Sequence, residues 1–158
     1  MELYIGNKNY SSWSLRAWLL LRQGGIAFTE RQLRLDWTLD SPFKKTLLAI
    51  APSGRVPLLV DDDGFAVWDS LAILEYLAER NRKLWPADPA ERARARSLAA
   101  EMHSGFPSLR NHMSMNVRKR YAGKGRTPEV LAEIERIKAV WNEAQKPFLF
   151  GAFTAADA

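Results

Sequence analysis

The stretch that decides the fold runs from Pro52 to Leu74 and reads PSGRVPLLVDDDGFAVWDSLAIL. Two short apolar runs, 56–60 and 65–68, flank an acidic turn that ends in a glycine, which is the strongest hairpin signal in the chain. Residues 70–80 then place Leu and Ile side chains at helical spacing on one face. We therefore predict two antiparallel strands followed directly by a helix.

The residues before this stretch predict a β-α-β opening. A short apolar run at 2–5 suits a buried strand, and a polar loop leads to a helix over 13–22 that ends at two glycines. Apolar and charged residues then alternate over 28–35, which predicts a second strand near an edge. We expect residues 36–45 to be irregular and 46–50 to form a single helical turn.

The residues after the stretch predict a change of architecture. Two prolines within a few residues indicate a linker over 81–89. Helical patterns follow over 90–112 and 128–145. We expect an α/β domain over residues 1–80 and an all-α domain over 90–158.

The end of the printed sequence has the pattern of a helix start. Thr154 and Asp157 have the spacing of a capping box, in which a side chain at each end binds the amide of the other. We expect this helix to need more residues than follow, so the all-α domain is interpreted as incomplete.

Composition excludes several classes of function. Hydrophobic residues make up 47% of the chain, enough to close a core, and no run of about 18 apolar residues could cross a membrane. The chain has no cysteine, so any thiol chemistry must come from a substrate. The two histidines are too isolated to indicate a metal site. We expect a cytoplasmic protein without a metal or a membrane partner.

The basic residues form two clusters. The formal net charge is +5, and the clusters lie at 92–96 and 118–120. Such runs are typical of solvated helix faces, so we do not expect a nucleic-acid partner, although an attraction for small anions stays open.

The order and spacing of Val56-Pro57, Asp69-Ser70 and Tyr76 resemble the glutathione transferase family. The resemblance implies a thioredoxin-like domain followed by a helical domain, with glutathione as co-substrate and no metal. It also implies a cis proline at Pro57, beside which the backbone of Val56 pairs with the extended tripeptide. Asp69 and Ser70 would hold its γ-glutamyl end, although they could instead simply cap a helix, and Pro57 could simply shape a strand entry.

The resemblance leaves the partner of the glycine carboxylate open among Arg55, Lys44 and Lys45. A basic side chain is common there in the family, and solvated lysines are the plain alternative.

The loop before the first helix holds the candidate catalytic group. Residues 10–16 read YSSWSLR, which is similar to the serine signature of the zeta class, and by that match Ser11 stabilises the thiolate. Ser12 is the near alternative, Tyr10 a weaker one, and an ordinary helix cap the plain reading. A hydroxyl donor and a helix N-terminus both lower a thiol pKa from about 8.5. The zeta signature has a cysteine where this chain has Trp13.

The family resemblance implies that the helical domain lines the pocket of a second substrate, with Phe106, Met113 and Asn116 as candidates. Methionine at helical spacing is also ordinary core. The expected function is transfer of glutathione to an electrophile, as in detoxification. Alternatives are a glutathione-dependent cis-trans isomerase of the maleylacetoacetate type and a non-catalytic binding module. The family resemblance also implies a homodimer.

Overall fold

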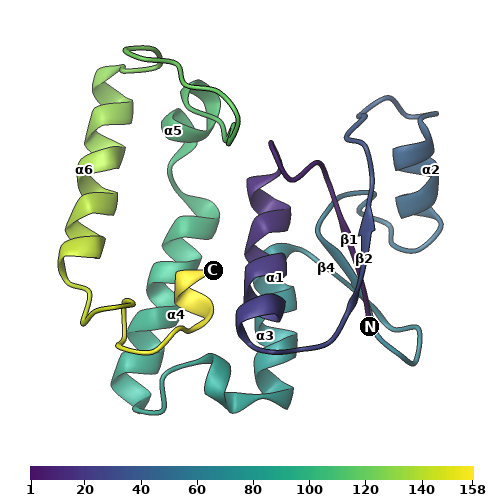
Figure 1. Ribbon diagram of the computed structural model, residues 1–158, viewed down its shortest axis with the longest axis horizontal. Coiled ribbons are helices and arrows are strands. Elements are labelled where there is room, and N and C mark those ends of the chain that lie inside the picture. The colour runs from purple at the N-terminus through teal and green to yellow at the C-terminus, as the bar shows by residue number, and fades with distance from the viewer. The chain divides into compact units, whose positions relative to one another are not determined.

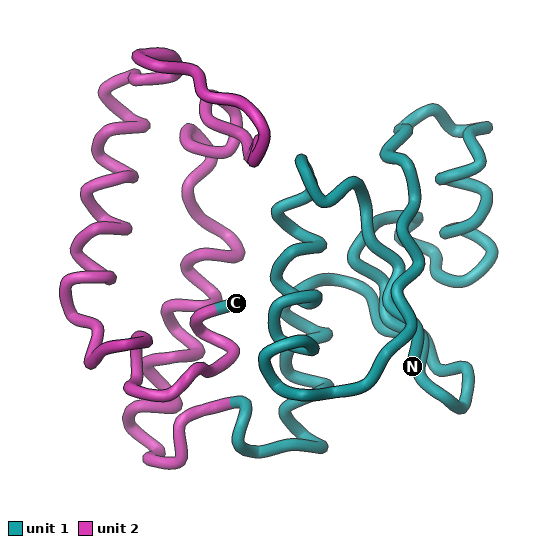
Figure 2. Tube along the Cα trace, in the orientation of Figure 1, with its two compact units in different colours: residues 1–84, 158 teal, residues 85–157 magenta.

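The computed structural model describes residues 1–158 and divides into two compact units, Met1–Leu84 and Trp85–Asp157 (Figure 2). We describe each unit by itself. None of the helices is long and apolar enough to span a membrane.

The first unit is a four-stranded sheet with helices on both faces (Figure 1). Its strand order is β2-β1-β3-β4; β1 is parallel to β2 and antiparallel to β3, and β3 is antiparallel to β4. This confirms the β-α-β opening, the hairpin and the helix after it, which together make a thioredoxin-like domain. The elements are β1 (Glu2–Ile5), α1 (Ser12–Gln23), β2 (Thr29–Gln32), α2 (Pro42–Leu48), β3 (Leu58–Val60), β4 (Ala66–Trp68), α3 (Ser70–Arg80) and the short η1 (Arg82–Leu84).

The sheet buries apolar side chains on both faces because successive residues of a strand point to opposite sides. Leu58 packs in a cluster with Phe43 and Leu47 of α2, while α1 and α3 pack together on the other face (Figure 1). Leu3, Ile5 and Leu59 are fully buried. The two faces fix the register of the strands, and the register in turn fixes which loops share an end of the sheet.

The expectation of irregular backbone over residues 36–45 is wrong in part, because α2 begins at Pro42. The side chain of Ser41 accepts a hydrogen bond from the Lys44 amide and caps the helix. Proline is favourable in the first turn, where its missing amide has no helical partner. Pro42 therefore starts a helix here.

The second unit consists of α4 (Pro89–Ser104), α5 (Pro107–His112), α6 (Pro128–Asn142) and the short η2 (Ala155–Asp157). The single helix expected over 90–112 is broken at Gly105 and Phe106, and Phe106 has a left-handed φ of 63°. A Cβ at Gly105 would lie 2.7 Å from the carbonyl oxygen of Glu101. Glu133 of α6 accepts hydrogen bonds from the amides of Ser108 and Leu109, so α5 takes its N-terminal cap from another helix.

Two further sequence interpretations can be compared with the second unit. Residues 118–120 lie in the loop between α5 and α6, so the helix face expected there is wrong. The capping box is confirmed in part: the Asp157 carboxylate accepts from the Thr154 amide at 2.8 Å, whereas the hydroxyl of Thr154 accepts from the Ala156 amide at 3.2 Å and not from the amide of Asp157.

Candidate functional site

The strand register brings three polar segments to one end of the sheet. Leu58, the first residue of β3, pairs with Tyr4 of β1 on one side and with Trp68 of β4 on the other. The loop after β1, the Val56-Pro57 pair before β3 and the Asp69-Ser70 pair after β4 therefore leave the sheet at the same end. The N-termini of α1 and α3 begin there too.

Val56 carries backbone groups that the fold leaves unpaired. The peptide bond between Val56 and Pro57 is cis, as the family resemblance implies, and Val56 is buried. No backbone hydrogen bond joins Val56 to another residue, because the ladder of β3 starts only at Leu58. Buried backbone groups are almost always paired in proteins. The N–H and C=O of Val56 can therefore accept an extended peptide as an added strand.

Asp69 and Ser70 form the start of α3. Asp69 has φ 77°, a left-handed conformation that costs a non-glycine residue about 1–3 kcal/mol and is concentrated at functional sites. Its Oδ1 accepts hydrogen bonds from the amides of Leu71 at 2.9 Å and Ala72 at 3.3 Å, so Asp69 does cap the helix. Ser70 is 2% exposed, and its hydroxyl has no hydrogen-bond partner. An unpaired buried hydroxyl at a helix N-terminus is suited to a carboxylate.

Ser11 caps α1 and is tied into the protein. Its hydroxyl donates to the Oγ of Ser14 at 2.8 Å and also accepts from the Ser14 amide. Ser14, which is buried, accepts a second hydrogen bond from the amide of Gly6 at 3.1 Å. Ser14 thereby joins the end of β1 to the first turn of α1. The sequence offered Ser14 only as a serine of the signature and a possible helix cap, and its hydrogen bonds to Ser11 and Gly6 were not predicted.

Ser12 differs from Ser11 in its hydrogen bonds. It is the first residue of α1, its side chain is half-buried, and its hydroxyl makes no hydrogen bond in the structure. A hydroxyl at this place can turn toward a ligand without breaking an existing bond. A thiolate bound here would receive that hydrogen bond and the positive end of the helix dipole, and both favour the ionised thiol.

The basic candidates have different surroundings. Lys44 donates from Nζ to the carbonyl oxygen of Gly54 at 2.9 Å and lies over the ring of Trp37 at 5.3 Å, so it fixes the loop before Val56. Arg55 is exposed and makes no hydrogen bond or ion pair. The buried hydroxyl of Ser53 in the same loop also has no partner, and sequence reasoning missed it.

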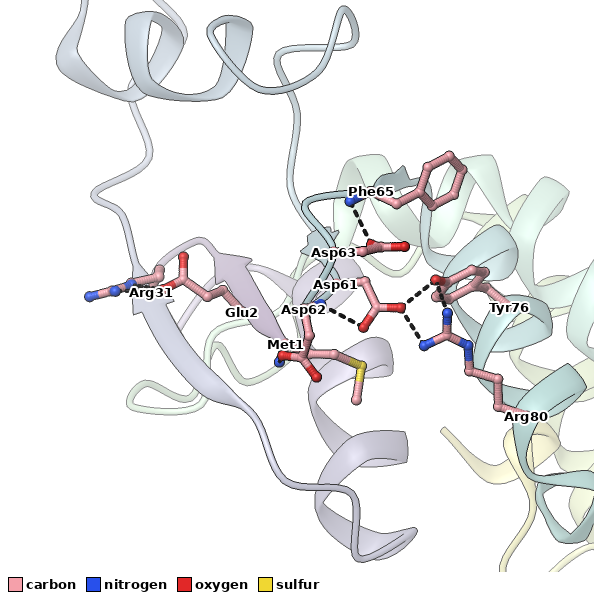
Figure 3. A network of polar contacts seen from close by, with 9 residues as sticks. All are labelled: Met1, Glu2, Arg31, Asp61, Asp62, Asp63, Phe65, Tyr76 and Arg80. Carbon is pink, nitrogen blue, oxygen red and sulfur yellow. Dashed lines mark hydrogen bonds and ion pairs between the residues drawn. The ribbon is translucent and has the colours of Figure 1, made fainter.

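The opposite end of the sheet carries a paired polar network (Figure 3). Asp61, after β3, accepts hydrogen bonds from the hydroxyl of Tyr76 at 2.5 Å and from the Asp62 amide at 2.8 Å, and forms an ion pair with Arg80. Arg80 also donates to the hydroxyl of Tyr76 at 2.6 Å. The Tyr76 bond, with the Asp62 amide and Arg80, holds the pKa of Asp61 below its ordinary value. The network anchors α3 to the hairpin.

The residues expected to line a second-substrate pocket lie at the two ends of α5 and in the loop after it. Phe106 is buried at the start of α5, and Met113 lies at the other end of this helix. Asn116 holds the following loop, donating to the hydroxyl of Tyr121 and accepting from the amide of Arg118. A cavity of about 150 Å³ in this unit is lined by other residues, namely Glu91, Arg94, Leu98, Val140, Glu143, Gln145, Leu149 and Phe150.

This chain is similar to known proteins in sequence and in structure. Residues 10–80 match the family model of the glutathione S-transferase N-terminal domain. Maleylacetoacetate isomerase of Pseudomonas aeruginosa is 32% identical over 123 residues, which are 77% of this chain and 57% of the relative. Glutathione S-transferase GstA of Escherichia coli O157:H7 is 30% identical over 161 residues, covering 92% of this chain and 73% of the relative.

One similar protein of known structure contains bound glutathione. A glutathione transferase homologue from Burkholderia, solved with bound glutathione, is 26% identical with a TM-score of 0.67 and covers 98% of this chain and 75% of its own. The chain spans about half the length of several of the relatives that it matches. The matched sequence and the fold show that this chain belongs to the glutathione S-transferase family.

Proposed function

We propose that this chain binds glutathione and activates its thiol for attack on a small electrophile. The observation that carries the proposal is a pair of unpaired groups at one end of the sheet: the backbone of the buried residue Val56 and the buried hydroxyl of Ser70. A tripeptide with a free amino-acid headgroup satisfies both.

Each part of glutathione has a candidate partner. The carboxylate of the γ-glutamyl group accepts from the Ser70 hydroxyl and the first amides of α3, and its ammonium group donates to Asp69. The cysteinyl backbone pairs with Val56 beside Pro57. The glycine carboxylate pairs with Arg55, which is exposed and forms no ion pair, or with Lys44.

The thiol lies by this arrangement at the N-terminus of α1. Family resemblance favours Ser11 as the thiolate donor, whereas the unbonded hydroxyl of Ser12 supports Ser12, because Ser11 already donates to Ser14. Lowering the thiol pKa raises the fraction of nucleophilic thiolate at neutral pH, and holding the electrophile beside it supplies proximity.

The test is binding of glutathione measured by calorimetry, with the ultraviolet absorbance of its thiolate followed against pH. We expect binding and a bound-thiol pKa well below the free value of about 8.5. Binding with an unshifted thiol pKa would favour a non-catalytic module of this fold. Absence of binding would overturn the proposal.

A second candidate is a glutathione-dependent cis-trans isomerase, favoured by relatives named maleylacetoacetate isomerase. Trp13 stands where the serine signature of that class has a cysteine. Product analysis separates the two reactions, because isomerisation returns glutathione unchanged and conjugation consumes it.

Two further expectations, on the oligomeric state and the location, are part of the proposal. We propose a homodimer, by analogy with the family, and a cytoplasmic location, where glutathione is reduced and available. The mass of the protein in solution, measured by light scattering, tests the dimer, and a monomer would remove that part of the proposal alone.

A further inference from the structure

The positive charge of this chain is concentrated in one segment. Residues 102–128 contain no Asp or Glu and hold six basic residues. The whole chain has 23 Lys and Arg against 18 Asp and Glu, so without these six the balance is 17 against 18, a net charge of −1. The excess of +5 therefore comes from this segment.

Five of the six basic residues, Arg118, Lys119, Arg120, Lys124 and Arg126, lie in the loop between α5 and α6. Two arginines elsewhere in the second unit form ion pairs with carboxylates: Arg94 pairs with Glu143, and Arg136 pairs with Glu101. In the loop, Lys119, Arg120, Lys124 and Arg126 are exposed and form no ion pair. The fold leaves these charges facing solvent without neutralising them.

The loop has a defined conformation that holds these charges together. Asn116 bonds both the Arg118 amide and the Tyr121 hydroxyl. Gly123 and Gly125 have φ of 74°, and a Cβ at Gly125 would lie 2.5 Å from the carbonyl oxygen of His112, so the turn needs glycine there. Two apolar side chains lie among the charges, Val117 at 68% and Tyr121 at 55% exposure.

We propose that the loop over residues 117–126, named here the basic loop, docks the protein on an anionic phospholipid surface. Each Lys or Arg near such a surface contributes about 1 kcal/mol, and tyrosine is favourable at the level of the headgroups. Val117 adds aliphatic area that enters the interface. The loop projects at the end of the second unit where α5 and α6 meet (Figure 1).

A membrane explains the loop better than a nucleic acid does. Single-stranded nucleic acids are bound in basic grooves lined by several aromatic side chains. Tyr121 is the only Phe, Tyr or Trp between Pro107 and Pro128. The exposed apolar side chain of Val117 can also enter a lipid interface, whereas a phosphate backbone offers it no apolar partner. This inference departs from two expectations drawn from sequence, which placed the basic run on a solvated helix face and foresaw no membrane partner.

The test is co-sedimentation with vesicles of phosphatidylcholine, with and without phosphatidylserine. We expect binding only to the vesicles that contain phosphatidylserine, and weaker binding as salt is added. The double variant Lys119→Gln/Arg120→Gln should weaken it by about 30-fold, at about 1 kcal/mol for each charge. Val117→Ser leaves the charge unchanged and should weaken binding by about fivefold, through the lost apolar area.

The matched control is Arg82→Gln/Lys83→Gln, which removes two exposed charges from η1 in the first unit. It should leave vesicle binding unchanged. Equal losses in the two double variants would overturn the proposal, because net charge would then explain the binding. Equal binding to neutral vesicles, or binding to a single-stranded oligonucleotide without binding to vesicles, would overturn it as well.

Discussion

The polar groups at the two ends of the sheet in the first unit differ in their hydrogen bonding. At the hairpin end, Asp61, Tyr76 and Arg80 bond one another, and the buried carboxylate of Asp61 is fully paired. At the other end the hydroxyl of Ser70 and the backbone of Val56 are buried without partners. An unpaired buried polar group costs about 1–3 kcal/mol.

Helix α3 runs between these two ends, so the comparison concerns one element. The network at Tyr76 and Arg80 fixes one end of the helix. The unpaired groups at the other end lower the stability of the free protein, and a bound ligand would pair them. We therefore expect the polar groups at the hairpin end to act on stability, and we propose that those at the other end act on binding.

The largest effect is expected for Asp61→Ala. It leaves Tyr76 and Arg80 without their common acceptor, and the free energy of unfolding should fall by about 3 kcal/mol in urea denaturation, at the low end for a buried pair because Arg80 is half-exposed. Glutathione affinity should stay within twofold. The control Asp62→Ala removes an exposed carboxylate and should change stability by less than about 1 kcal/mol. A large loss of glutathione affinity in Asp61→Ala would mean that the hairpin end also acts on binding, and the contrast between the two ends would then be wrong.

Ser70→Ala should have the opposite profile. Losing a hydrogen bond to a charged group should raise the glutathione Kd by about 10- to 150-fold in calorimetry. Unfolding free energy should not fall, because the hydroxyl has no partner in the free protein. Ser97→Ala on the exposed face of α4 serves as the control for a serine deletion. A loss of stability with unchanged affinity would make Ser70 a structural residue.

Ser12→Ala and Ser11→Ala should separate thiolate stabilisation from helix capping. We expect Ser12→Ala to raise the pKa of the bound thiol by about one unit, equivalent to about 1.4 kcal/mol, without loss of stability. Ser11→Ala should lower unfolding free energy by about 1 kcal/mol through the lost cap and change the thiol pKa less. The two readouts are thiolate absorbance and urea denaturation. If Ser11→Ala instead gave the larger rise in the pKa of the bound thiol, Ser11 would be the thiolate donor.

The smallest effect concerns pH at the hairpin end. The pKa of Asp61 is lower in the folded protein than the ordinary value of about 3.9, so its contribution to stability is present above that pH and is lost as the pH falls below it. The difference in unfolding free energy between the native chain and Asp61→Asn should be constant above about pH 5 and shrink in more acidic solution. A difference independent of pH would mean that the carboxylate charge contributes nothing.

Local chemistry made some elements predictable. The helix over residues 70–80 was predicted with its observed bounds, because an acidic glycine turn and an Asp cap are encoded in adjacent residues. The start of α2 was missed because residues 36–45, which contain Pro42, were expected to be irregular, while the cap at Ser41 makes Pro42 a helix start. The break at Phe106 was missed because its cap, Glu133, comes from α6.

The candidate site shows the same division. Val56-Pro57 and Asp69-Ser70 could be selected from sequence, since their order and spacing form a motif. The bond from Ser11 to Ser14 could not, because it depends on how the first turn of α1 meets Gly6 at the end of β1.

The sequence by itself determined most elements of the first unit, the family and the three polar segments of the candidate site, because turn, cap and strand signals are local. Only the tertiary structure decided which groups are already bonded: Ser11 is, and Ser12, Ser70 and the backbone of Val56 are not. It also showed that the basic run 118–120 lies in a loop whose charges are held together. The physical reason is that hydrogen bonding and burial depend on neighbours that are distant in the chain.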